Sequence, residues 1–208
     1  MSALWSTIIG LAGGIALSIL FWFLTTHLIV PRVRFSDRIS KRFAPDGTPS
    51  YEIRVINRSR FRGVIDLSTS SVVRCDGLTM FQHSTRVPAL LFCIPTTFTN
   101  IVKLRPRDGF RVIRLDLDGA FADASTHYRR AFRLDVFDPA ATGPLEYVLT
   151  RGDDAYLRVE VLGNDEWTGV RKYFCSPKYT MADIVHGEFD GMVLRPIVVP
   201  VEASGQLT

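Results

Sequence analysis

The hydrophobic pattern divides the chain into one long apolar segment and a following region in which apolar and polar residues alternate. Residues 4–30 contain no Lys, Arg, Asp or Glu. A bilayer core of ~30 Å needs about 20 helical residues, so one helix of this length can span it with some tilt. Trp5 and Trp22 stand towards the two ends, where amphipathic rings suit the membrane–water interfaces. We therefore predict a single transmembrane helix within residues 1–30.

A cleaved signal peptide is the alternative interpretation of this segment. Such a peptide has a charged start, a shorter apolar core and a small-residue cleavage site. The first four residues have no charged side chain, and residues 27–31 show no A-x-A pattern. Pro31 then ends the helix. These features favour an uncleaved membrane anchor.

A cluster of basic residues, here called the basic collar, follows Pro31 directly. It consists of Arg32, Arg34, Arg38, Lys41 and Arg42. Cytoplasmic segments beside a membrane helix are enriched in Lys and Arg, so we predict the N-terminus outside a plasma or inner membrane and the rest of the chain in the cytoplasm. The same charges would attract anionic phospholipid headgroups, at ~1 kcal/mol per residue near the surface. Topology alone and lipid-headgroup binding both remain open as explanations of the collar.

The charge distribution supports a membrane more than a nucleic acid as the partner. The chain of 208 residues has a net charge of +4. Residues 31–62 hold nine Lys or Arg against three acids, whereas residues 63–208 hold sixteen against eighteen. The basic excess therefore lies next to the predicted anchor and not across the remainder of the chain. We expect no nucleic-acid partner.

After Phe43 the pattern becomes that of short strands separated by turn signals. Pro45-Asp46-Gly47 predicts a turn, and the alternation after it predicts a half-buried strand. Strands are expected at residues 51–55, 64–75 (with Ile65, Leu67, Thr69, Ser71 and Val73 on one face), 110–118, 133–137, 155–162 and 167–175, the last two joined by a turn at Gly163–Asp165. A single helical turn is expected to begin at Pro144, pass through Leu149 and close near Gly152. A short helix is expected from Thr180 to Gly187, and loops are expected at 95–100 and 119–128.

Many short strands of this kind predict a mainly β protein with a β-sandwich fold. We divide the chain into an anchor helix (1–30), a basic juxtamembrane linker (31–50), a cytoplasmic β-sandwich domain (51–200) and a mobile tail (201–208).

The sequence offers no convincing catalytic, metal or cofactor site. Cys75, Cys93 and Cys175 lie far apart and have no zinc-site spacing. His186 lies near two acids, but such a group is more often a surface cluster than a metal site. A Cys175–His186 nucleophile would lack an orienting third group. We therefore expect a protein that is not an enzyme and needs no cofactor.

The apolar segment also carries a G-x-x-x-G pattern at Gly10 and Gly14. Small residues at this spacing let two membrane helices approach closely, although the pattern also arises by chance in apolar segments. We take these glycines as a candidate helix-association face and expect a homo-oligomer.

Several segments resemble the cytoplasmic domain of inward-rectifier potassium channels. The collar is followed by Phe35-Ser36-Asp37 and then by Arg54-Val55-Ile56-Asn57, with basic residues after it. Near the other end, residues 159–169 and 176–189 are similar to the family's valine run and its S-Y-x-x-x-E-I ending, with one spacing that differs before Phe189. The resemblance covers about two-thirds of the chain. It implies an immunoglobulin-like sandwich of the early-set type, anionic-lipid binding by the collar and a ring-shaped assembly.

The departures from that family limit what the resemblance implies for function. A potassium-selective pore needs two membrane helices and a T-x-G-Y-G filter, and this sequence has one apolar segment and no such filter. Two expectations follow. The first is a membrane-anchored, non-enzymatic module for binding and oligomerisation. The alternative is an accessory or regulatory subunit of an ion channel whose pore is made by another chain.

Overall fold

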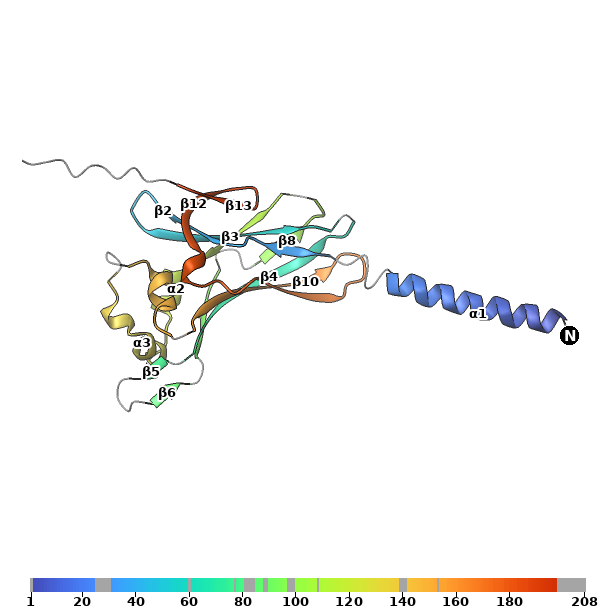
Figure 1. The fold of residues 1–208 in the computed structure, drawn as a ribbon, viewed down its shortest axis with the longest axis horizontal. Coiled ribbons are helices and arrows are strands. Elements are labelled where there is room, and N and C mark those ends of the chain that lie inside the picture. Colours follow the sequence, from blue (N-terminus) through green and yellow to red (C-terminus); the bar gives the residue numbers. More distant parts are fainter. Residues whose placement is uncertain are drawn as a thin grey trace, which may run out of the picture.

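The N-terminal segment forms one long helix in the computed structural model. The structure describes residues 2–24, 31–59, 61–76, 78–80, 85–87, 90–96, 100–107, 109–138, 142–152 and 154–197. Helix α1 (Ser2–Phe23) has 22 residues, which corresponds to about 33 Å at ~1.5 Å per residue. It extends away from the rest of the chain (Figure 1), and none of Trp5–Phe23 is buried. By length and composition α1 can cross a membrane, a property that signal sequences share. Residues 25–30 of the predicted span lie outside the described residues.

The first of two larger sheets is built around β3. Its strands are β1 (Val33–Phe35), β2 (Ile39–Phe43), β3 (Pro49–Asn57), β9 (Arg111–Leu115), β12 (Ile184–Asp190) and β13 (Val193–Pro196). β9 runs antiparallel along one edge of β3, while β1 and β2 pair in succession along the other edge. β12 then pairs in parallel with β2, and β13 pairs with β12. β1 and β2 therefore belong to this sheet, although we expected residues 31–50 to be a linker.

The second sheet is built around β4. Its strands are β4 (Val64–Cys75), β7 (Leu90–Ile94), β8 (Asn100–Leu104), β10 (Tyr156–Asp165) and β11 (Arg171–Cys175). β10 lies antiparallel along one edge of β4 and carries β11 on its far side. β7 and β8 share the other edge of β4. A separate small hairpin joins β5 (Leu78–Met80) to β6 (Thr85–Val87).

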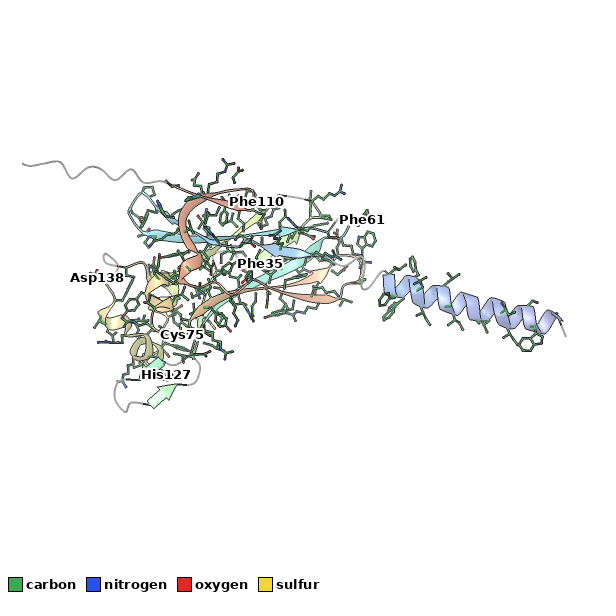
Figure 2. All side chains as sticks on the ribbon, in the orientation of Figure 1. Phe35, Phe61, Cys75, Phe110, His127 and Asp138 are labelled. Atoms are coloured by element: carbon green, nitrogen blue, oxygen red, sulfur yellow. The ribbon has the colours of Figure 1, made fainter. Side chains whose placement is uncertain are left out.

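The two sheets form two layers with the hydrophobic core between them (Figures 1 and 2). One cluster of buried side chains includes Ile53 from β3, Ile113 from β9, Leu67 from β4, and Val159 and Val161 from β10. The mainly β prediction is thus confirmed, with two sheets and one N-terminal apolar helix. Burial of this kind is the principal stabilising contribution, at about 25 cal/mol per Å² of apolar surface.

Short helices cover one end of the core. They are α2 (Leu117–Ala122), α3 (Thr126–Phe132), η2 (Leu134–Val136) and α4 (Pro144–Leu149), with η3 (Met181–Asp183) preceding β12. The Phe92 ring of β7 lies 5.2 Å from the Phe132 ring and 6.1 Å from the Phe121 ring, between centroids. These aromatic contacts attach α2 and α3 to the second sheet.

β3 is buried on both faces, whereas the alternation predicted a half-buried strand. Glu52 and Arg54 point to the outer face and are nevertheless buried. The guanidinium of Arg54 lies 3.6 Å from the centroid of Phe110 and 4.9 Å from that of Phe189. It also donates to the carbonyl oxygen of Gly191 at 2.5 Å. Phe189 and Gly191 belong to the β12–β13 hairpin, so this hairpin covers the outer face.

The strand at 64–75 is confirmed, but its buried face differs at one position. Leu67 and Val73 are buried as expected, together with the polar residues at 69 and 71. Ile65 is instead half-buried and Val64 is buried. Asp66 has a φ of 51°, and the pairing of β10 with β4 shifts register nearby. Because of this irregularity, the side chains before residue 66 point to the opposite faces of the sheet from those that strict alternation predicts.

Three segments expected to be strand or loop are helical. The strand expected over 110–118 ends at Leu115, because the Asp116 carboxylate accepts the Gly119 N–H at 2.9 Å and begins α2. The loop expected over 119–128 contains most of α2 and the start of α3, and the strand expected at 133–137 is the single turn η2. The loop expected at 95–100 includes Thr96, which bridges to Leu115, while residues 97–99 lie outside the described part of the chain.

Two turns also differ from expectation. β10 and β11 form the predicted hairpin, but residues 163–165 belong to β10 and the chain reverses over residues 166–170. The capping box of Thr180 and Asp183 is present, yet it begins a single 3-10 turn, and Gly187 lies in β12. The helix predicted to begin at Pro144 is present, but it ends at Leu149 and not near Gly152. The turn at Pro45–Gly47 is as predicted, and the Gly47 N–H donates to the Ala44 carbonyl oxygen at 2.9 Å.

Candidate membrane-facing surface

The five residues of the basic collar do not form one patch, because they follow β3 over much of its length. Arg34 pairs opposite Ile56, whereas Arg42 pairs opposite Ser50. Six residues along a strand correspond to ~20 Å at about 3.3 Å per residue. Arg32 and Arg34 therefore lie at the end of the domain where the chain enters, and Lys41 and Arg42 lie towards the opposite end.

The collar residues differ in their partners as well. Arg32 and Arg38 are exposed, and Arg34 pairs with Asp37 at 3.3 Å while remaining exposed. Arg38 lines a small open pocket with Asp37 and residues 192–194. Arg42 pairs with Glu188 of β12 at 3.2 Å. Of these four residues, Arg32 and Arg34 lie closest to the point where the chain enters the domain.

Lys41, the fifth collar residue, forms an interior ion pair. Its Nζ lies 2.6 Å from the Glu146 Oε1, and the two side chains are 18% and 8% exposed. The Tyr51 hydroxyl donates to the other carboxylate oxygen of Glu146. Burial, followed by this hydrogen bond, raises the pKa of Tyr51 above its ordinary value. The charge of Lys41 is therefore directed at the domain and not at the surface.

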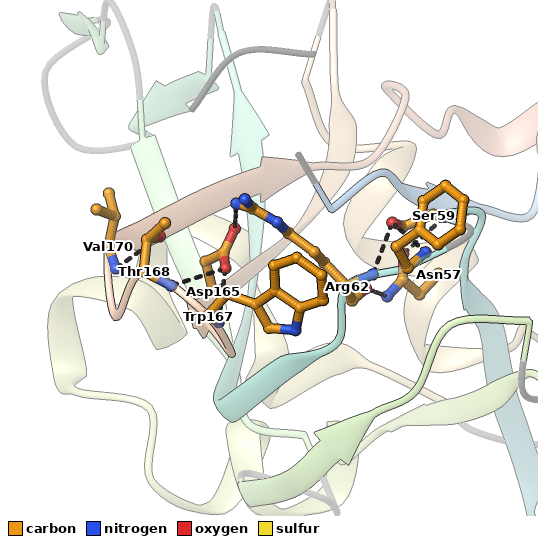
Figure 3. Close-up of polar contacts among 8 residues, drawn as sticks. Asn57, Ser59, Arg62, Asp165, Trp167, Thr168 and Val170 are labelled. Carbon is orange, nitrogen blue, oxygen red and sulfur yellow. Dashed lines mark hydrogen bonds and ion pairs between the residues drawn. The ribbon is translucent and has the colours of Figure 1, made fainter. Parts of the chain in front are cut away.

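A network of hydrogen bonds organises the end where the chain enters, which we call the entry end. It comprises Arg32, the loop after β3 and the turn after β10. The Arg58 N–H donates to the Arg32 carbonyl oxygen at 2.7 Å. The Asn57 amide nitrogen donates to the carbonyl oxygens of Arg62 at 2.7 Å and Leu104 at 3.2 Å, and its oxygen accepts the Ser59 N–H at 2.9 Å. Asn57 thus fixes the loop after β3 (Figure 3).

A buried ion pair joins this loop to the turn after β10 (Figure 3). The Arg62 Nη1 lies 3.1 Å from the Asp165 Oδ2, with the side chains 2% and 1% exposed. The other oxygen of Asp165 accepts the N–H groups of Trp167 at 2.9 Å and Thr168 at 3.2 Å. Burial by itself would raise the pKa of Asp165, but these N–H groups and Arg62 hold it below its ordinary value. The arrangement fixes the position of Trp167, whose ring lies 4.9 Å from the Arg62 guanidinium.

The outer side of the entry end is basic and aromatic. Phe61 and Trp167 are 65% and 63% exposed, and Figure 2 places Phe61 at the end of the domain that is nearest α1. β8 ends here, since Leu104 pairs opposite Val64, which itself pairs opposite Asp165. Among the described residues, the exposed basic side chains at this end include Arg32, Arg34, Arg58, Arg105, Arg107 and Arg171. Glu166 in the same region pairs with Lys103.

Sequence reasoning did not find most of this surface. Arg105 and Arg107 are far from Arg171 in the chain, and Phe61 and Trp167 stand more than a hundred residues from each other. Only the strand pairing places them together. The local signals were the collar residues Arg32 and Arg34 and the basic stretch after Asn57, which the sequence resemblance included.

The two glycines of the candidate helix-association face lie on the exposed surface of α1. A Cβ atom added at Gly10 or Gly14 meets no heavy atom within 4 Å. This face of α1 is therefore open to contact with a second helix.

The remaining candidate residues do not come together. Cys175 pairs opposite Glu160 in the second sheet, whereas His186 pairs opposite Lys41 in the first sheet. Within the described residues, no group of three or more His, Cys, Asp or Glu side chains is placed to hold a metal ion. Cys75 is buried, and burial raises the pKa of its thiol to about 12.

Comparisons with known proteins do not assign the chain to a family. A scan against protein-family models found no match, and a search of curated proteins found no match either.

Proposed function

We propose that this protein is a single-pass, non-enzymatic membrane protein whose cytoplasmic β-domain serves as a binding and oligomerisation module. The observation that carries the proposal is the unburied apolar helix α1, which leads into the domain at its basic entry end. A helix that has no charged side chain and in which none of Trp5–Phe23 is buried is stabilised by a bilayer, where its backbone groups are satisfied internally. Basic residues directly after it favour the cytoplasmic side for the domain.

We further propose that the domain is an immunoglobulin-like sandwich of the early-set type, as in the inward-rectifier cytoplasmic domain. Two of the segments that carry the resemblance contact each other, which supports this proposal. The hydroxyl of the buried Tyr179 donates to the Ser36 carbonyl oxygen at 2.5 Å. Tyr179 also forms a β-bridge with Leu157, so the segment after β11 lies across both sheets.

Anionic phospholipid headgroups are the membrane ligand in this proposal, and the collar residues are expected to contribute unequally. Arg32 and Arg34 contribute most, because they are exposed and lie at the entry end. Lys41 contributes least, because Glu146 holds its ammonium group inside the domain. This attraction falls off within a Debye length of ~8 Å at physiological salt.

A topology measurement tests the proposal. A reporter that is active only in an oxidising compartment is fused after Thr208, and a second copy is fused before Met1. We expect no signal from the C-terminal fusion and a signal from the N-terminal one. The reverse pattern would show that the domain is outside, and secretion of a cleaved domain would show that α1 is a signal sequence.

The second candidate function is an accessory or regulatory subunit of an ion channel whose pore is made by another chain. The contact of Tyr179 with Ser36 favours it, since both residues belong to the channel-like segments. Affinity purification of the full chain in mild detergent tests this candidate. A pore-forming membrane protein is expected to co-purify in fixed ratio, and purification of this chain by itself would reject it.

A further inference from the structure

Two large aromatic side chains are exposed on neighbouring loops of the entry end. Phe61 follows the loop that Asn57 fixes, and Trp167 begins the turn that Asp165 fixes. Both rings are more than half exposed. An indole with one apolar body and one N–H donor is poorly suited to full hydration and well suited to a membrane–water interface.

The length of the connection keeps this surface close to the end of α1. Six residues separate Leu24 from Pro31. Whatever their conformation, they bridge at most about 25 Å, at ~3.6 Å per residue. Arg32 is hydrogen-bonded to Arg58, which adjoins Asn57 in the chain, and further hydrogen bonds lead from Asn57 to Arg62 and onward to Asp165 and Trp167. If α1 spans a bilayer, the entry end must therefore lie near its surface.

The charges around the two rings match an anionic bilayer. Arg32, Arg58, Arg105 and Arg171 are exposed at this end. Two exposed acids of the region are already paired, Asp37 with Arg34 and Glu166 with Lys103. Headgroup attraction and ring insertion would act together here, because the basic side chains lie beside the aromatic ones.

The buried ion pair makes the surface rigid before it meets lipid. Arg62 contacts Asp165 on one side and the face of the Trp167 ring on the other. A ring that is already oriented loses little conformational freedom on insertion, which favours binding.

From these observations we infer that Phe61 and Trp167 insert into the interface of the bilayer that α1 crosses, flanked by arginines that contact its anionic headgroups. The inference rests on the proposed function, since it requires α1 to be an anchor. It adds a second membrane contact, made by the folded domain, which fixes how the domain stands on the membrane.

Tryptophan quenching by brominated lipids in nanodiscs tests the inference on the full chain. The chain has three tryptophans, so Trp5→Phe with Trp22→Phe leaves Trp167 as the only indole. In discs of anionic lipid, we expect the emission maximum of Trp167 to lie at shorter wavelength than that of an indole in water. Bromination of the lipid close to the headgroup should lower the emission intensity relative to unbrominated discs. Bromine near the chain ends should quench it less.

Two matched variants serve as controls. Trp5→Phe with Trp167→Phe leaves Trp22 in α1, and its quenching reports whether α1 is in the bilayer. Phe43→Trp, made with all three native tryptophans changed to Phe, places an indole at a site that is 56% exposed at the far end of β2. Phe43 pairs opposite Pro49 and Val33 pairs opposite Asn57. These positions are about 26 Å apart along β3, at ~3.3 Å per residue, so the indole at position 43 should not be quenched.

The outcomes separate the inference from the proposed function. Quenching of Trp167 and Trp22, with no quenching of the indole at position 43, supports both. Quenching of Trp22 with an unquenched, solvent-like Trp167 overturns the inference and leaves the anchor intact. Absence of quenching at Trp22 overturns the proposed function. Equal quenching at positions 43 and 167 overturns the inference that the domain contacts the membrane specifically through its entry end.

Discussion

At the scale of single residues, the ion pair of Arg62 and Asp165 connects stability to the surface that the domain presents. Both side chains are almost fully buried, and the carboxylate accepts hydrogen bonds from the turn as well as from the guanidinium. Removing one member of such a pair leaves an uncompensated charge inside the protein. The pair therefore contributes to stability, and the hydrogen bonds of the same carboxylate fix the position of Trp167.

Asp165→Asn tests this coupling. The amide oxygen can still accept the N–H groups of Trp167 and Thr168, but the amide nitrogen faces the Arg62 donors. We expect the free energy of unfolding to fall by about 3–5 kcal/mol, measured by chemical denaturation of the full chain in detergent. Glu166→Gln in the same turn is the matched control, because its pair with Lys103 is partly exposed and should contribute at most about 1 kcal/mol. Equal effects of the two substitutions would contradict the prediction that the buried ion pair contributes more to stability than the partly exposed one.

The pH dependence of stability follows from the same carboxylate. The pKa of Asp165 is lowered in the folded protein, so the unfolded state binds its proton first as the pH falls. This contribution is present above the unfolded pKa of about 3.9 and is lost as the pH falls through the folded value. We expect the wild-type protein to lose stability below about pH 4 more steeply than Asp165→Asn, measured by unfolding at several pH values. Parallel profiles would contradict the prediction.

The three cysteines should differ in reactivity. Burial raises the pKa of Cys75 to about 12, while Cys93 and Cys175 are exposed. Only the thiolate reacts rapidly with a maleimide, so at pH 8 the native protein should take up two equivalents quickly and the third only on unfolding. Mass spectrometry of the labelled protein counts the equivalents. Rapid labelling of Cys75 in the folded state would show that solvent and the maleimide reach the part of the core that contains this thiol.

At the scale of elements, the sequence was informative where local pattern and tertiary context agree. β4, the β10–β11 hairpin and the helix at Pro144 follow from alternation or from a proline at a helix start. The α2–α3 segment was missed because its apolar residues pack against Phe92 of a distant strand, which no local pattern reveals. The burial of Glu52 and Arg54 was missed for the same reason, since the covering hairpin lies more than a hundred residues later.

That covering hairpin provides an element-scale prediction at Gly187 in β12. A Cβ atom at Gly187 would overlap the backbone carbonyl of Arg195 in β13, and backbone cannot move aside as a flexible side chain can. We expect Gly187→Ala to destabilise the protein by about 1–3 kcal/mol and to expose the outer face of β3, detected by thermal unfolding and by amide hydrogen exchange.

Gly109→Ala is the control for this substitution. Its added Cβ meets no heavy atom within 4 Å, and Gly109 is not among the glycines of positive φ. We expect little change in either measurement. A Gly187→Ala protein as stable as the control would mean that the β12–β13 hairpin is not held against β3.

At the scale of the whole molecule, α1 and the domain are joined by a short connection, so contacts made by either part assist the other. Domains tethered in one plane meet at a high effective concentration, even if each contact is weak in solution. The collar, which the sequence presents as one cluster and a candidate lipid-headgroup site, is divided between the two ends of β3. Only strand pairing, which a linear sequence does not display, determines this division.

The last prediction concerns assembly through α1. Gly10 and Gly14 lie one turn apart on an unburied helix, and a Cβ atom added at either position meets no heavy atom within 4 Å. Gly10→Leu with Gly14→Leu should therefore leave the domain folded, and should weaken association of the full chain by preventing close approach of two helices. We expect light scattering in detergent and in nanodiscs to show an oligomer for the wild-type chain and a smaller species for the double variant.

Ala12→Leu with Ala16→Leu has the same spacing and adds similar bulk, and it serves as the control. Because residues two apart on a helix face different directions, these positions lie off the Gly10–Gly14 line, and we expect the oligomer to survive. Loss of the oligomer in both double variants would show that bulk anywhere on α1 disrupts packing. A wild-type chain that is monomeric in every detergent and in nanodiscs would reject assembly through this helix.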